Sequence, residues 1–102
     1  MTLEAEFHQA MMEVYEVAKD HDYNAAYFKR MIDEHGGVEA AKRLLAKREI
    51  QSGLVRLWEL GLLNSSMEAA VLQERFSVLF TEAEVQEARQ RLEQLDFFRG
   101  SS

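Results

Sequence analysis

Helical spacing of the apolar residues is the feature that most limits the fold of this chain. Apolar side chains recur three and four residues apart along almost all of its 102 residues, and no segment keeps the alternation of a β-strand. The chain has no proline and only five glycines, too few for the many turns of a β-sandwich or barrel. We therefore expect an all-α fold, a compact orthogonal bundle of five or six short helices.

Apolar faces and helix-ending residues place these helices. The predicted helices cover about residues 3–18, 25–35, 38–45, 54–60, 67–80 (one distorted helix or two short ones) and 82–95. The first and last are predicted to be the longest. Gly36 and Gly37 suit the corner between the second and third helices, because a helix often ends at a left-handed glycine. The alternative for this glycine pair is weak anion binding at the free amides of the third helix.

Short polar residues mark several helix starts. Residues 65–68 and 81–84 have the Ser/Thr-x-x-Glu form of a capping box, in which two side chains satisfy two free amides reciprocally. Asn24 and Ser52 are further candidate N-caps. The sequence thus predicts a single domain over residues 1–99. Residues 100–102, Gly-Ser-Ser, form a tail that fits either a native end or a remnant of cloning.

Composition limits the chemistry that the protein can perform and the cellular compartment in which it is expected. The absence of cysteine excludes a disulfide scaffold, a thiolate metal site and a cysteine nucleophile. The first residues are acidic where a signal peptide would be basic, and no stretch approaches the ~20 apolar residues that span a bilayer. We therefore expect a cytoplasmic location.

No motif for catalysis, a cofactor or a metal is visible. His8 follows Glu4 by one turn, but no third ligand follows and there is no His-Glu-x-x-His sequence. The favoured interpretation of His8 is a surface histidine beside a carboxylate. No serine lies in a Gly-x-Ser-x-Gly elbow. The prediction is therefore a protein without catalytic, cofactor-binding or metal-binding residues, although two carboxylates could still meet in the fold as an acid–base pair.

Charge is unevenly distributed along a chain whose formal net charge is −6. Residues 29–56 hold seven basic and four acidic residues, whereas both flanks are acidic. Several of these cations have a carboxylate four residues away, as Arg43 has Glu39, which is typical of a solvated helix face. The pair Glu87–Arg91 near the end of the chain has the same spacing. The basic residues without such a neighbour are the better candidates to contact a partner; they are Lys42, Lys47, Arg48 and Arg56.

Trp58 is the aromatic residue with the clearest binding potential. It is the only tryptophan, it precedes Glu59, and large aromatic residues frequently anchor interfaces. The alternative is that Trp58 and the three tyrosines cover the edge of the core.

The residues also carry a resemblance that extends over nearly the whole chain. Its strings are Tyr23-Asn24-Ala25, Glu34-His35-Gly36-Gly37, Ala41-Lys42-Arg43-Leu44-Leu45, Leu57-Trp58-Glu59 and Leu79-Phe80-Thr81. In these strings the chain resembles an uncharacterised small bacterial all-helical domain, found stand-alone or as an end segment of larger proteins. One departure is Gly61-Leu62-Leu63-Asn64, where the pattern has Gly-Arg-Leu-Asp. The resemblance implies an all-helical fold and no catalytic residue.

The favoured function is a non-enzymatic protein-interaction or regulatory module of a bacterial cytoplasmic protein. The candidate partner-binding residues are Trp58, Glu59, Lys42, Lys47, Arg48 and Arg56. The alternative is a nucleic-acid-associated accessory protein whose basic middle segment contacts phosphates. A small hydrolase that uses carboxylates brought together by the fold, and self-association through apolar helix faces, are further hypotheses.

Overall fold

A computed structural model describes residues 2–47, 52–95 and 97, and these residues form helices without any β-strand. The all-α class is confirmed. The elements are α1 (Leu3–Asp20), α2 (Ala26–His35), α3 (Gly37–Leu45), α4 (Ser52–Glu59), the 3₁₀ helix η1 (Leu63–Ser65), α5 (Met67–Val71), α6 (Glu74–Ser77) and α7 (Glu82–Gln94). Helices α1 and α7 are the longest, with 18 and 13 residues, as predicted. The predicted number of five or six helices is too low, because the described part has seven α-helices and residues 67–80 form two of them, α5 and α6.

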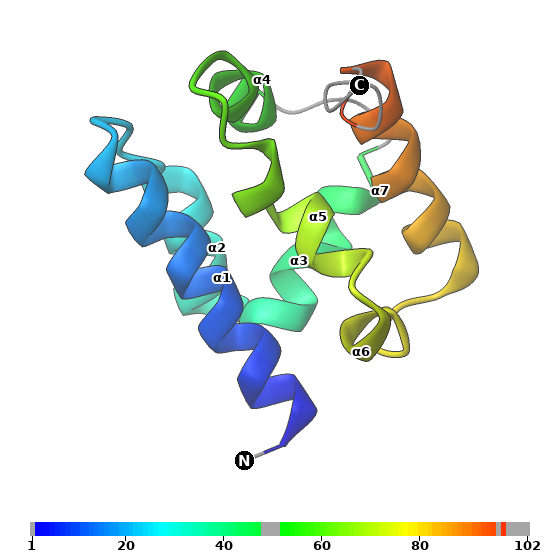
Figure 1. Ribbon diagram of the computed structural model, residues 1–102. Helices are drawn as coiled ribbons and strands as arrows, with labels where there is room; N and C mark the ends of the chain where they lie inside the picture. Colours follow the sequence, from blue (N-terminus) through cyan, green and yellow to red (C-terminus); the bar gives the residue numbers. More distant parts are fainter. Residues whose placement is uncertain (1, 48–51, 96, 98–102) are drawn as a thin grey trace.

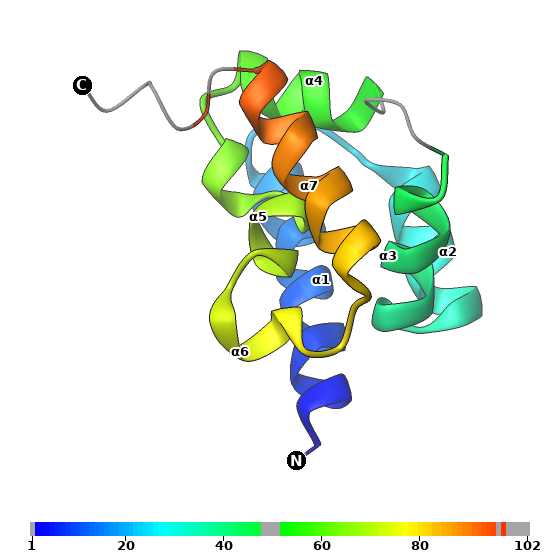
Figure 2. The same ribbon diagram turned by 90° about the vertical axis from the view of Figure 1, so that its right-hand side faces the viewer.

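Helix α3 lies at the centre of the bundle. It packs against α1 and α2 on one side and against α7 on the other (Figure 1). Helix α5 lies beside α7 and also contacts α1, and the view turned by 90° shows α7 in front of α1 (Figure 2). In both views α4 lies at one end of the bundle and α6 near the other. No helix in the described part of the chain is long and apolar enough to cross a membrane.

The main core forms where α1, α3 and α5–α7 meet. Phe7 is fully buried, and its ring meets the rings of Phe76 and Phe80 edge to face, each at 5.1 Å between centroids. Met11 and Ile32 complete the contact from α1 and α2. A smaller cluster holds α4 and η1 against α7; its buried residues are Leu54, Leu63 and Leu92.

The glycine corner brings α3 close to α1. Gly36 has φ +83°, and a Cβ on Gly37 would lie 2.6 Å from the Cα of His8. The backbone N–H of Gly37 donates to Nδ1 of His8 at 3.0 Å. The interpretation of His8 as a partner of a surface carboxylate is therefore wrong: its ring satisfies the free amide that starts α3. Because His8 occupies that amide, the geometry favours the corner over an anion site.

One predicted capping box is confirmed and the other is wrong. The Thr81 hydroxyl accepts the N–H of Glu84 at 3.1 Å, and the Glu84 carboxylate accepts the N–H of Thr81 at 2.8 Å. At α5 the cap is Ser66, whose hydroxyl accepts the N–H of Ala69 at 3.1 Å. Glu68 plays no part in that cap, because its side chain turns inward to an ion pair.

The two single-residue caps also differ from expectation. Helix α2 begins at Ala26 without a side-chain cap, and the Asn24 side chain instead accepts the Tyr15 hydroxyl at 3.3 Å. Ser52 is already the first residue of α4, so it does not cap that helix.

Candidate functional site

A cavity of about 300 Å³ lies between α1, α2, α4 and the start of α5. Most of its wall is apolar, contributed by Val14, Phe28, Leu44, Leu54, Leu57 and Met67. Its polar lining residues are Tyr23, Asn24, Tyr27, Ser52 and Glu68. The volume is at the small end of the range of small-molecule sites, roughly 300 to 1,000 Å³. The cavity therefore suits one or two large apolar side chains.

Two cations flank an aromatic ring at the rim of this cavity. Tyr27 is 48% exposed. The Lys47 ammonium lies 5.2 Å from the centre of the Tyr27 ring and donates to the Tyr27 hydroxyl at 3.2 Å. The Arg30 guanidinium lies 5.9 Å from the centre of the same ring. These contacts keep positive charge beside the apolar opening.

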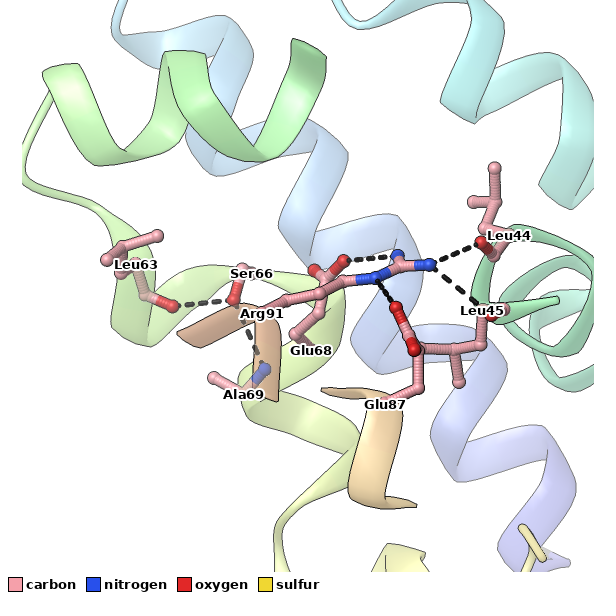
Figure 3. A network of polar contacts seen from close by, with 8 residues as sticks. All are labelled: Leu44, Leu45, Leu63, Ser66, Glu68, Ala69, Glu87 and Arg91. Carbon is pink, nitrogen blue, oxygen red and sulfur yellow. Dashed lines mark hydrogen bonds and ion pairs between the residues drawn. The ribbon is translucent and has the colours of Figure 1, made fainter. Parts of the chain in front are cut away.

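Beneath the cavity, Glu68 belongs to a buried network centred on Arg91 (Figure 3). Arg91 is 1% exposed and donates to Glu87 at 2.8 Å, to Glu68 at 3.1 Å, and to the carbonyl oxygens of Leu44 and Leu45 at 3.0 and 3.3 Å. The guanidinium thereby ties α7 to α5 and to the end of α3. It satisfies the Leu45 carbonyl and is a further donor to the Leu44 carbonyl, which also accepts the N–H of Lys47 at 3.4 Å.

Burial within this network raises the pKa of the Glu68 carboxyl. One guanidinium faces two carboxyls, so ionising both would leave a net negative charge in the interior. The Glu87 side chain is 20% exposed and keeps contact with water, whereas Glu68 is almost fully buried. Burial therefore raises the pKa of the Glu68 carboxyl, and attraction to Arg91 offsets only part of this rise.

The candidate residues on α4 lie next to the cavity and outside it. Trp58 is 49% exposed and follows the lining residue Leu57, but it does not line the cavity. Arg56 lies 3.5 Å from the carboxylate of Glu59, so these two candidates pair with each other. Together they form an exposed face of α4.

The candidates from the basic segment are separated by the fold. Lys47 lies against Tyr27, which lines the cavity. Lys42 points to α7, where it binds Glu84 at 2.8 Å and lies 5.2 Å from the centre of the Phe80 ring. Burial acts to raise the pKa of Glu84, but its hydrogen bonds from Lys42 and from the amide of Thr81 outweigh this and lower the pKa. Arg48 lies outside the described residues.

Sequence reasoning missed Glu68 and Arg91. Glu68 matched a capping pattern, and Arg91 matched an ordinary i,i+4 pair with Glu87. One available signal was the position of Arg91, three residues after the inward-facing Ala88 and four before Leu95, which places it at the edge of the buried stripe of α7.

The arrangement is better suited to binding an apolar group than to acid–base chemistry. A carboxyl with a raised pKa is one half of an acid–base pair. The described residues that line the cavity include no second carboxyl and no histidine, and no group of three metal-binding side chains occurs in the described part of the chain. A scan against protein-family models, a search of curated proteins and a search of solved structures found no match to this chain, so its function is inferred from these residues.

Proposed function

We propose that this protein is a non-enzymatic protein-interaction module of the bacterial cytoplasm, and that it binds a partner through the cavity and the adjoining face of α4. The cavity carries the proposal. A Leu- or Phe-sized side chain that leaves water for such an apolar site contributes about 1.5–3 kcal/mol. Tyr27 and Trp58, each about half exposed, add aromatic surface of the kind enriched at interfaces.

The charge arrangement favours a protein partner over nucleic acid. Four cations of the basic segment already lie 2.7–3.5 Å from carboxylates; they are Lys29, Lys42, Arg43 and Arg56. Binding to phosphates would require these cations to exchange their carboxylate partners, which weakens the electrostatic gain on which nucleic-acid binding depends.

A pair of matched variants tests the proposal. Ala26 is exposed at the start of α2 and lines the cavity, so Ala26→Phe places a ring at its mouth. Ala83 is also exposed, in the first turn of α7, and lies outside the cavity, so Ala83→Phe is the control. Quantitative pull-downs with both variants and with Trp58→Ala should show partners lost with Ala26→Phe, reduced with Trp58→Ala and retained with Ala83→Phe.

Circular dichroism would first establish that all three variants fold. If folded Ala26→Phe retains every protein that the wild type binds, the cavity is not the binding site and the proposal fails.

A further inference from the structure

Most basic side chains of the described residues are neutralised by nearby carboxylates. Ion pairs of 2.7–3.5 Å involve Lys29, Lys42, Arg43, Arg56, Arg75 and Arg91. The structure shows no ion pair for Lys19, Arg30 or Lys47 within the described ranges, and of these three Arg30 and Lys47 both lie against the ring of Tyr27. In a chain with a formal net charge of −6, two cations without an ion pair therefore lie beside Tyr27, a residue that lines the rim of the apolar cavity.

The wall and floor of the cavity restrict what enters it. The wall is mostly apolar, so a charged group that enters loses its hydration without compensation. Glu68 on the floor adds a carboxyl, which disfavours an acidic group inside the cavity. An acidic group can bind only at the rim, where Lys47 and Arg30 keep their exposed cationic heads.

From this charge complementarity we infer that the partner is an acidic peptide segment, with one large apolar side chain in the cavity and an adjacent Asp or Glu at Lys47 and Arg30. The inference rests on the proposed function and specifies its ligand. The apolar side chain gives affinity by burial, and the neighbouring carboxylate selects the sequence through charge.

Selection from a random peptide library tests the inference directly, because the library samples every short sequence that a partner could present. Peptides displayed on phage are selected on the wild-type protein at low salt and depleted on Ala26→Phe, which removes those that bind elsewhere. The expected result is enrichment of a large apolar residue with Asp or Glu within two positions of it. Enrichment of peptides with Lys or Arg in those positions, or with no charge preference, overturns the inference but leaves the interaction module intact. If no peptide depends on the open cavity, the proposed function fails as well.

A charge reversal at the rim provides the second test. Lys47→Glu should weaken binding of a synthetic copy of the best acidic peptide by about 3- to 10-fold at low salt, measured by isothermal titration calorimetry. The control is Arg75→Glu, which makes the same charge change on α6, beside the N-terminal part of α1. Equal weakening by both variants would mean that only net charge matters, and it would overturn the placement of the peptide carboxylate at Lys47 and Arg30. Unchanged binding by Lys47→Glu would overturn it too.

Discussion

Replacing Arg91 should be among the most destabilising single changes in this protein. Arg91→Met retains most of the aliphatic part of the side chain but removes the guanidinium, which joins three helices. Four hydrogen bonds of 2.8–3.3 Å are lost, and Glu68, 3% exposed, is left without its cation. Breaking a buried ion pair by removing one partner costs about 3–5 kcal/mol. A domain of this size has roughly 5–15 kcal/mol of stability, so the variant loses much of it.

Arg43→Met is a closely matched control. Arg43 also follows a glutamate by four residues and also pairs with it, at 3.0 Å to Glu39, but its side chain is 53% exposed. An exposed pair of this kind contributes about 0.3–0.5 kcal/mol. Urea unfolding followed by circular dichroism at pH 7 should therefore separate the two variants by at least about 2 kcal/mol. A loss of unfolding free energy below about 1 kcal/mol for Arg91→Met, or equal losses for both variants, would refute the conclusion that burial makes the Arg91 network important for stability.

Three further predictions concern Glu68, a helix contact and a cap. Because burial raises the pKa of Glu68 in the fold, the unfolded state releases this proton first, and wild-type stability falls as pH rises from about 4.3 through the folded pKa. Glu68→Gln should therefore gain stability relative to wild type over that window in urea unfolding between about pH 4 and 8, and a relative loss would contradict the direction of the shift. Gly37→Ala should lower the free energy of unfolding by about 1–3 kcal/mol, because its Cβ would meet the backbone of α1. Gly53→Ala, which meets only the end of a tyrosine side chain, should change it by less than about 1 kcal/mol in the same assay. In thermal unfolding, Ser66→Ala should lower the free energy of unfolding by about 1 kcal/mol, whereas Ser65→Ala should leave it almost unchanged. A larger loss for Ser65→Ala would show that the cap is misassigned.

Local sequence patterns predicted the features that depend on neighbouring residues. The apolar face of α1 is buried at Phe7, Met11 and Ala18, because residues three, four and seven apart share one side of a helix. The capping box at Thr81 was predictable for the same reason, since both of its bonds lie within four residues. The matching pattern at residues 65–68 failed only because a tertiary contact drew Glu68 inward to Arg91.

The cavity could not be predicted in this way. Its wall joins residues from Val14 to Glu68, and spacing along one helix gives no information about which helices meet. Lys47 shows the consequence. Its lack of a nearby carboxylate was visible in the sequence, but its place beside Tyr27 depends on the packing of α2 against α3.

Two pairs of identical local form show where the sequence stops being sufficient. Glu39–Arg43 and Glu87–Arg91 have the same residues at the same spacing, and the i,i+4 contact of both follows from helix geometry alone. The first remains a solvated pair. In the second, Arg91 is buried, because α5 brings Glu68 and α3 brings two backbone carbonyls to its guanidinium. The sequence by itself determined the helices and the contacts within them, which need only local geometry. Only the tertiary structure decided which of the two arginines is removed from solvent. Burial turns an ordinary i,i+4 surface pair into a network that joins three helices.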